Sequence, residues 1–166
     1  MSVSMLSPRI LRIQSPLGGV TLAASDAGLC GVWFQAQKHF PDLHRWPEAP
    51  DDALLREAGK QLAGYFAGKR RVFDLPLDTS RGTPFQREVW AALGKVDYGC
   101  TTSYGALAAT LGRASAVRAV GAAVGRNPMS VIVPCHRVLG KDGSLAGYAG
   151  GLDRKIALLQ LEGAVS

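Results

Sequence analysis

Cys135 and His136 are adjacent in the segment Pro134-Cys135-His136-Arg137-Val138, and their side chains are the ones in this chain best suited to nucleophilic chemistry. A cysteine attacks as its thiolate, and a nearby imidazole or guanidinium lowers the pKa of the thiol toward neutrality. The segment comes directly after the very apolar run Ser130-Val131-Ile132-Val133. This pattern predicts a buried strand that delivers one thiol to a fixed place.

The sequence leaves two questions about Cys135 open. Adjacent side chains of a strand point to opposite faces, so His136 would touch Cys135 directly only if the strand ends here, and otherwise through a bridging water. The competing interpretation is a buried structural cysteine, because free cysteine is among the most buried residue types. Sequence adjacency therefore indicates proximity but not a hydrogen bond.

The composition is that of an ordinary globular protein with a basic balance. The 166 residues, 47% of them hydrophobic, suffice for one compact domain or two small lobes. Nineteen Lys and Arg against thirteen Asp and Glu give a net charge of +6, which favours a polyanionic partner without identifying it. No apolar run approaches the roughly 20 residues of a membrane helix, and the first residues lack a secretory signal. We expect a cytoplasmic protein that does not contact membranes.

The three cysteines, Cys30, Cys100 and Cys135, are widely spaced and form no Cys-x-x-Cys pair. This spacing predicts neither a disulfide framework nor a closed zinc site, and it fits a reducing compartment. Cys30 and Cys100 have no basic neighbour that would activate them, so both are interpreted as structural. We expect no metal and no cofactor.

The first half of the chain has the pattern of a small sheet covered by a helix. Short β-rich runs between residues 9 and 35 are broken by turn residues, which predicts an antiparallel meander. Residues 39–52 are interpreted as a loop, and apolar residues then recur at helical spacing from Leu54 to about Gly68. Phe73 to Leu77 could be an edge strand or an extended linker.

The second half begins with a clear helix signal. Thr83 is a candidate N-cap, Pro84 suits the first helical position, and Gln86 completes a capping box for a helix to about Leu93, with Trp90 in its core stripe. Two short helices should come next, one over 104–111 that ends at Gly112 and one over 116–124 that ends at a left-handed Gly125. Their length and spacing are typical of a helix-turn-helix.

The small residues of the 116–124 helix allow two interpretations that stay open: close packing on its neighbours, or close approach of its backbone to a DNA groove wall. Beyond it, Lys141-Asp142-Gly143-Ser144 predicts a hairpin turn. The three glycines of residues 147–151 allow a ligand to approach the backbone closely. A last helix over 153–161 should turn Ile156, Leu159 and Leu152 inward. Glu162 lies just after it, where the helix dipole disfavours an acid, so this glutamate needs a partner.

Seven short motifs between Thr83 and Gly163 resemble, in the same order, the O6-alkylguanine-DNA alkyltransferases, also called methylated-DNA–protein-cysteine methyltransferases. The motifs are Thr83-Pro84-Phe85-Gln86, Thr102-Ser103-Tyr104-Gly105, Arg118-Ala119-Val120-Gly121, Asn127-Pro128, Pro134 to Val138, Gly147-Tyr148-Ala149-Gly150-Gly151 and Leu161-Glu162-Gly163. They cover about half of the chain, and the N-terminal half matches only loosely.

The resemblance implies an α/β protein of two domains. Residues 1–78 would form a ribonuclease H-like lobe, a small antiparallel sheet with a covering helix. Residues 79–166 would form a mostly helical, winged-helix-like lobe with the helix-turn-helix and the active-site cysteine. Some relatives carry an N-terminal zinc site, but this lobe offers only Cys30, His39 and His44 as soft ligands, so the prediction of no metal stands.

The implied function is direct-reversal DNA repair. The protein would flip O6-alkylguanine out of duplex DNA, with O4-alkylthymine as a candidate second substrate, and transfer the alkyl group irreversibly to Cys135, once per molecule. The partner is double-stranded DNA that contains the lesion. We expect a monomer, and cooperative binding along DNA stays open.

The resemblance also implies a role for each site residue. The catalytic set is Cys135 as nucleophile, His136 as base through a water, Glu162 as partner of His136, Tyr104 as proton donor toward guanine N3, and Asn127 as the residue that orients Cys135. Arg118 would fill the space of the flipped base, and Ala116, Val117, Ser103 and Arg137 would also contact DNA. The guanine pocket would be lined by Tyr148, Ala149, Val138 and Gly147, with only the backbone of Ala149 contributing, since many relatives have serine there.

Plain structural interpretations compete with several of these roles. Arg118 could be a solvated helix charge, Tyr104 a half-buried packing residue and Asn127 a turn former. Three other functions also compete. Lesion-binding relatives that transfer nothing replace the cysteine, so the presence of Cys135 argues against that class. The roughly 80 residues before Thr83 leave no room for the sensor module of a helix-turn-helix regulator. A cysteine hydrolase is compatible with Cys135, His136 and Glu162.

Overall fold

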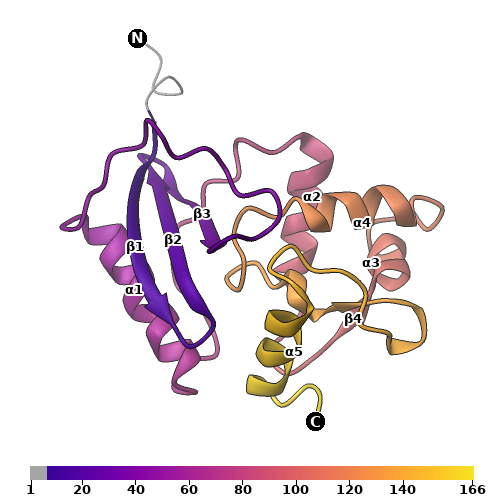
Figure 1. Ribbon diagram of the computed structural model, residues 1–166. Helices are drawn as coiled ribbons and strands as arrows, with labels where there is room; N and C mark the ends of the chain where they lie inside the picture. Colours follow the sequence, from indigo (N-terminus) through magenta and orange to yellow (C-terminus); the bar gives the residue numbers. More distant parts are fainter. Residues whose placement is uncertain (1–6) are drawn as a thin grey trace. The chain divides into compact units, whose positions relative to one another are not determined.

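The computed structural model describes residues 7–166 and consists of two compact units, one that ends at Thr79 and one that starts at Ser80 (Figure 1). Among residues 7–166, no helix is long and apolar enough to span a membrane.

The first unit contains the predicted antiparallel meander. Strands β1 (Arg9–Ser15), β2 (Gly18–Ser25) and β3 (Gly28–Phe34) pair in the order β1-β2-β3. Arg12 is paired with Thr21, which in turn is paired with Trp33, so these three side chains share one face of the sheet. Strand β3 is buried along its whole length, as a strand packed on both faces should be.

Helix α1 (Ala53–Phe66) covers one face of this sheet, as predicted. Its apolar stripe, Leu55, Ala58, Leu62 and Tyr65, is fully buried. On the other face, Trp33 lies over Gly31, where a Cβ atom would meet its ring, and packs against Trp46 from the predicted loop at 6.0 Å between ring centroids. The three-stranded sheet is therefore the middle layer of the unit.

The connection out of the first unit is extended, and the side-chain amide of Gln61 holds it by bonding to the main chain of Asp74. The buried side-chain amide of Gln61 donates to the Asp74 carbonyl at 3.0 Å and accepts from the Asp74 amide at 2.9 Å. Leu77 forms a single parallel bridge to Leu29 of β3. Of the two interpretations left open for residues 73–77, the linker fits best, with one bridge at its end.

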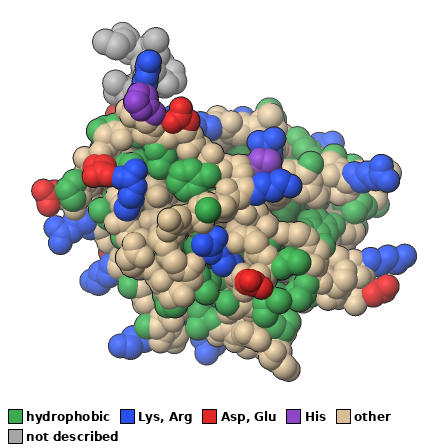
Figure 2. Space-filling view, in the orientation of Figure 1, with side chains coloured by type: hydrophobic (Ala, Val, Ile, Leu, Met, Phe, Trp, Pro, Cys, Tyr) green, Lys and Arg blue, Asp and Glu red, His purple; other side chains and the backbone are tan. Residues whose placement is uncertain are grey.

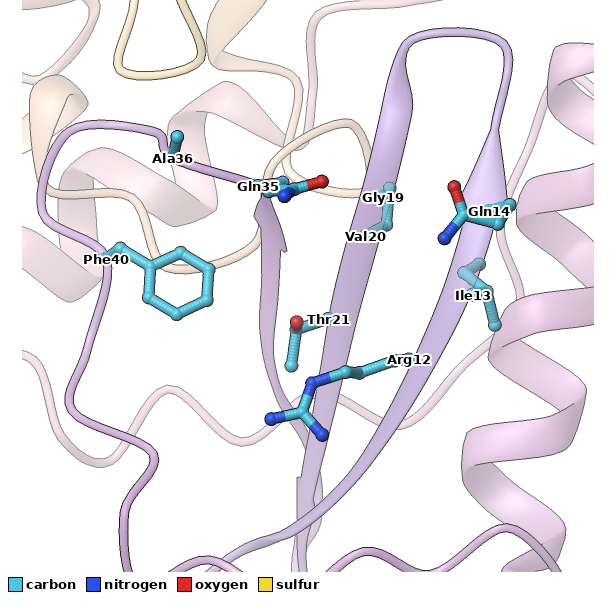
Figure 3. Close-up of a pocket in the computed structure, with 9 residues that line it drawn as sticks. All are labelled: Arg12, Ile13, Gln14, Gly19, Val20, Thr21, Gln35, Ala36 and Phe40. Atoms are coloured by element: carbon cyan, nitrogen blue, oxygen red, sulfur yellow. The ribbon is translucent and has the colours of Figure 1, made fainter.

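A pocket of about 580 Å³ opens on the first unit beside the sheet (Figure 3). Its lining residues are Arg12, Ile13, Gln14, Gly19, Val20, Thr21, Gln35, Ala36 and Phe40. Figure 3 shows the Phe40 ring and the Arg12 and Thr21 side chains around the opening. Arg12 is paired with Glu48, so its charge is already compensated.

The second unit opens with helix α2 (Pro84–Leu93), whose predicted start is confirmed in detail. The Thr83 hydroxyl accepts from the Gln86 amide at 3.1 Å, and the Gln86 side chain accepts from the Thr83 amide at 3.0 Å. Trp90 is 5% exposed, and its indole Nε1 donates to the carbonyl of Ala123 at 2.8 Å. This bond fastens α2 to the second helix of the helix-turn-helix.

The helix-turn-helix consists of α3 (Tyr104–Thr110) and α4 (Val117–Gly125), joined through Gly112 in the left-handed region at φ 69°. Ser103 caps α3 by accepting from the Ala106 amide at 3.0 Å. The prediction of a left-handed Gly125 is wrong. Gly125 is the last helical residue of α4, and its φ is not positive.

The predicted strand before the reactive cysteine is also wrong. Residues 130–133 form a tight turn in which Val131 adopts φ 72°, and the Val133 amide bonds to the Met129 carbonyl at 2.9 Å. The turn leads into a short 3-10 helix, η2 (Cys135–Arg137). Val131 and Val133 are buried as expected, so the apolar run correctly indicates burial but not extended structure.

Two short parallel strands flank the site, β4 (Thr102–Ser103) and β5 (Val138–Leu139). The predicted Asp-Gly turn comes next, with Asp142 and Gly143 both at positive φ inside the short 3-10 helix η3 (Lys141–Gly143). It does not make a hairpin, because residues 144–151 contain no strand. Helix α5 (Leu152–Leu161) closes the unit and buries Leu159, whereas Leu152 is 46% exposed, contrary to the prediction.

Candidate active site

Cys135 is the first residue of η2 and is 5% exposed. Asn127 braces the turn that carries it: its side-chain amide donates to the carbonyl of Val133 at 2.8 Å, and its oxygen accepts from the amide of Met129 at 3.0 Å. Asn127 thus bonds to both ends of the turn, so the plain interpretation as a turn former and the role of orienting Cys135 are compatible.

Burial raises the pKa of the Cys135 thiol to about 11, although a hydrogen bond from Asn127 and the charge of Lys155 act in the opposite direction. The thiol is therefore protonated at neutral pH in the unreacted protein. Transfer to an electrophile requires a base for its proton.

His136 and Glu162 form the expected pair, with His136 Nε2 2.7 Å from Glu162 Oε2 and both side chains fully buried. Burial lowers the pKa of His136; Glu162 raises it, while Arg137 and Lys155 lower it further. A neutral imidazole with its proton on Nε2, directed at Glu162, leaves Nδ1 as an acceptor. That Nδ1 is buried and has no hydrogen-bond partner within residues 7–166.

The burial of Arg137 does not support the DNA contact expected of it. Arg137 is 6% exposed, and its guanidinium donates to both carboxylate oxygens of Glu162, from Nε at 2.8 Å and from Nη2 at 3.0 Å. Its Nη1 donates to the Val96 carbonyl at 2.5 Å. In this structure the guanidinium is bonded to Glu162 and Val96, and Arg137 lies in the interior of the site.

Lys155 is a site residue that the sequence interpretation does not include. Its ammonium is buried and donates to the carbonyls of Val138 at 2.6 Å, Ala146 at 2.9 Å and Gly147 at 3.4 Å. Burial lowers its pKa to about 8, and the nearby Cys135 acts to raise it. The sequence does contain a signal for the burial of Lys155. It lies three residues before Leu158 and four before Leu159, on the apolar stripe of α5.

Two tyrosines lie close enough to the thiol to interact with it electrostatically. Burial raises the pKa of Tyr104, and Cys135 raises it further; the Tyr104 hydroxyl donates to the Gly147 carbonyl at 3.5 Å. Burial likewise raises the pKa of Tyr148 well above its ordinary value, with Cys135 adding to the effect and the Ser130 hydroxyl opposing it. The loop of Gly147 and Tyr148 thus flanks Cys135.

The remaining predicted pocket residues lie nearby in different environments. Val138 is fully buried at the start of β5, Gly147 is exposed and Ala149 is partly exposed. Lys155 joins the carbonyls of Val138 and Gly147, so the pocket loop and the backbone after Cys135 share one buried cation.

The predicted DNA-binding residues other than Arg137 lie on the helix-turn-helix surface. Arg118 is exposed in the first turn of α4, Val117 beside it is 38% exposed, and Ala116 is partly exposed at the N-cap position. Ser103 uses its oxygen as a helix cap. Figure 2 shows Lys and Arg side chains scattered over the visible face rather than gathered in one patch.

Cys30 and Cys100 differ in environment: Cys30 is buried in β3, whereas Cys100 is exposed, which does not support the structural role expected of it. Within residues 7–166, the structure contains no group of three or more His, Cys, Asp or Glu residues that could hold a metal ion.

The fold and the site together define a class of protein: a DNA-binding helix-turn-helix unit that encloses a buried thiol backed by a His–Glu pair, preceded by a small α/β unit. Two family profiles match the chain in this order. They are the ribonuclease-like domain of 6-O-methylguanine DNA methyltransferase, over residues 12–79, and the DNA-binding domain of the same family, over residues 84–164.

Curated relatives named methylated-DNA–protein-cysteine methyltransferase include those of Mycolicibacterium paratuberculosis and Methanosarcina acetivorans. Each is 47% identical to this chain over 90% of this chain's length. The match covers 89% of the Mycolicibacterium protein and 95% of the Methanosarcina protein. Among solved structures, the crystal structure of Mycobacterium tuberculosis OGT in complex with DNA is similar with a TM-score of 0.86 and 44% identity, covering 96% of this chain and 94% of that one. The chain belongs to the 6-O-methylguanine DNA methyltransferase family.

Proposed function

We propose that this protein repairs O6-alkylguanine in duplex DNA by transferring the alkyl group to the Sγ atom of its own Cys135, once per molecule. The observation that carries the proposal is the buried Cys135 thiol beside a His136–Glu162 pair joined at 2.7 Å, in the same unit as an exposed helix-turn-helix. The relatives' names, which describe transfer from methylated DNA to a protein cysteine, support it.

The reaction is an in-line displacement at a saturated carbon. The thiol proton passes toward His136 Nδ1 through a water, and the sulfur attacks the alkyl carbon. The new S–C bond forms as the C–O6 bond breaks, and the electron pair of that bond leaves with guanine. Tyr104 donates a proton toward N3 so that the departing base leaves without a negative charge, and the thiol proton replaces the one it gave. The net products are S-alkylcysteine and guanine.

Substrate access requires that the nucleotide leave the base stack, because O6 lies inside the duplex. We propose that the first turn of α4 contacts the DNA and that Arg118 occupies the space of the flipped base. Its exposed position, beside the exposed Val117, supports this role. Tyr148, Val138 and the backbone of Gly147 and Ala149 would line the guanine pocket.

The product is a thioether, a bond that none of the side chains around Cys135 is placed to hydrolyse. The reaction should therefore stop after one equivalent. Residues 1–78 and 79–166 are proposed as the supporting and the reacting domain. We also propose a cytoplasmic location. A free reactive thiol persists in a reducing compartment, and the DNA substrate must be present in the same compartment.

The test is mass spectrometry after the protein is mixed with a slight excess of duplex carrying O6-methylguanine. One added methyl group on the Cys135 peptide, with the reaction ending at one equivalent, is the expected result. Cys135→Ser serves as the control and should bind the duplex without gaining mass. Tight binding by the unaltered protein with no mass change would instead place it among lesion-binding proteins, and turnover on esters or amides would place it among hydrolases.

A further inference from the structure

Arg137 has its whole guanidinium engaged next to the residues that deprotonate Cys135. Two of its nitrogens bind the Glu162 carboxylate in a fork, at 2.8 Å and 3.0 Å, and the third binds the carbonyl of Val96. Its guanidinium carbon also lies 5.8 Å from the ring centroid of Tyr98. An arginine on the surface could be solvated by water instead. These contacts together hold the Arg137 side chain in one position.

Glu162 is the group on which these contacts converge. Its side chain is fully buried, and its Oε2 accepts from His136 Nε2 at 2.7 Å and from Arg137 Nη2 at 3.0 Å. Its Oε1 accepts from Arg137 Nε and from the amide of Gly99, the latter at 3.3 Å. A buried carboxylate at a helix C-terminus is costly unless a cation compensates it, and Arg137 is the cation in contact.

We propose that Arg137 is a positioning residue for the transfer reaction: by neutralising Glu162, it keeps His136 an uncharged imidazole whose Nδ1 accepts the proton of Cys135. This inference rests on the proposed function, since it concerns the base of that reaction. It also assigns to Arg137 a role inside the protein, in place of the DNA contact expected from the sequence.

The effect of Arg137 on His136 is electrostatic. A carboxylate alone next to an imidazole favours the imidazolium, because the opposite charges attract in a medium of low dielectric. An imidazolium carries a proton on both nitrogens and has no lone pair left to accept one. A carboxylate already paired with a guanidinium still orients the imidazole through a hydrogen bond, but the two charges largely cancel at His136. Arg137 therefore preserves the orientation while removing most of the pull on a second proton.

Other titratable groups face the pair from neighbouring elements. Lys155 from α5 lowers the pKa of His136 further, whereas Glu162 alone raises it. The remaining groups are the Cys135 thiol and the phenols of Tyr98, Tyr104 and Tyr148. Substitutions confined to Arg137 and Glu162 keep all of them, so a change in the titration of His136 then reports on Arg137 and Glu162.

The experiment monitors the imidazole of His136 by NMR in the unreacted protein, together with the pH dependence of methyl transfer from an O6-methylguanine duplex. Arg137→Met removes the charge and keeps an unbranched side chain. We expect its His136 titration midpoint, and the pH at which transfer reaches half its maximum, to move upward together by about 1 to 3 pH units. Arg137→Lys keeps the charge but loses the fork, and should leave the midpoint near that of the unaltered protein.

A charge-balance variant keeps the inference testable if Arg137→Met folds poorly. Glu162→Gln leaves Arg137 uncompensated and should move the His136 midpoint downward, and the double variant with both changes should restore it. His39 and His44 lie in the first unit and serve as internal controls whose titrations should not move. A uniform loss of rate with an unmoved His136 midpoint in Arg137→Met or in Glu162→Gln would overturn the proposal.

Failure of this inference is distinguishable from failure of the proposed function. Absence of methyl transfer by the unaltered protein would refute the function, whereas the NMR midpoints need no substrate. Transfer by the unaltered protein with the same His136 midpoint in all variants would keep the function and remove the role of Arg137.

Discussion

The ammonium of Lys155 lies 2.6 Å from the carbonyl oxygen of Val138, three residues after the reactive cysteine. The same group donates to the carbonyls of Ala146 and Gly147 in the loop that carries Tyr148. One buried cation on α5 thus holds the backbone on both sides of the proposed guanine pocket and supplies a positive charge near the Cys135 sulfur.

Replacement of Lys155 by Met should slow methyl transfer at neutral pH. The charge of Lys155 opposes the effect of burial on Cys135, whose pKa is about 11, so its removal makes the thiolate still harder to form. The rate should be measured in single-turnover experiments over a range of pH. Lys60→Met removes an exposed lysine of α1 and is the matched control. An unchanged rate in Lys155→Met would show that this charge does not act on the thiol.

Arg118→Ala should reduce transfer from duplex DNA far more than reaction with free O6-benzylguanine. Only the duplex requires a base to be flipped, so the ratio of the two rates isolates that step. Arg126→Ala, at the opposite end of α4 and also exposed, is the control for lost charge. It should weaken DNA affinity in a salt-dependent manner, and with duplex at saturating concentration it should leave the ratio unaltered. Equal losses on both substrates in Arg118→Ala would remove Arg118 from base flipping.

Asn127→Ala should destabilise the protein by about 1 to 3 kcal/mol and slow transfer, because the buried Met129 amide loses its acceptor and the Val133 carbonyl keeps only the Cys135 amide as a donor, at 2.8 Å. Asn127→Asp can still accept from Met129 but adds a negative charge near the thiol. We expect the aspartate variant to transfer more slowly at neutral pH than the alanine variant. Urea unfolding and single-turnover rates measure the two effects, and a faster aspartate variant would contradict the electrostatic part of this account.

Asp52 should contribute to stability in a pH-dependent manner. It caps α1 by accepting from the Leu55 amide at 3.0 Å and pairs with Arg9 at 2.6 Å. Burial acts to raise the pKa of Asp52, but the Leu55 hydrogen bond and Arg9 outweigh it, so the pKa is lowered from 3.8. A carboxyl with a lowered pKa in the folded state stabilises above its ordinary pKa, and this contribution is lost as the pH falls through the lowered value.

Asp52→Ala should therefore cost about 1 kcal/mol at neutral pH, with a smaller difference in strong acid. Asp52→Asn keeps a capping oxygen and should lose less, which separates the cap from the ion pair. Thermal unfolding at several pH values measures both. A difference between Asp52→Ala and the unaltered protein that does not shrink in acid would refute the assignment.

The sequence predicts best those helix ends that are set by residues close together in the chain. The capping box of Thr83 and Gln86 lies within one turn of helix, so the sequence places the start of α2 to the residue. Leu152 fits the helical spacing of α5, which predicts an inward position, yet it lies in the first turn, where the helix has not reached the core. Periodicity indicates a face, but not how far along a helix that face is covered.

The parts of the site that the sequence does not predict depend on long-range contacts. The pairing of Glu162 with His136 is expected, but its second partner, Arg137, is expected on DNA. The sequence around Arg137 does not indicate whether its side chain points into the protein or toward solvent. Helical spacing could indicate that Lys155 is buried, but it cannot indicate the partners of Lys155, because these are main-chain carbonyls, which any sequence provides. The run before Cys135 resembles a strand because burial and β-branching are shared by strands and by tight buried turns.

Val131 introduces backbone strain into the turn that carries Cys135. A β-branched residue at φ 72° costs roughly 1 to 3 kcal/mol, and the segment persists because Asn127 and its buried neighbours hold it. In amide hydrogen exchange, Val133 and Cys135 should open at lower free energy than the central amides of α2, whose bonds belong to a regular helix. The reactive residue would then belong to a part of the molecule that opens separately from α2. Val131→Gly removes the strain, so it should raise the hydrogen-exchange protection of the Val133 and Cys135 amides and leave that of the α2 amides unchanged.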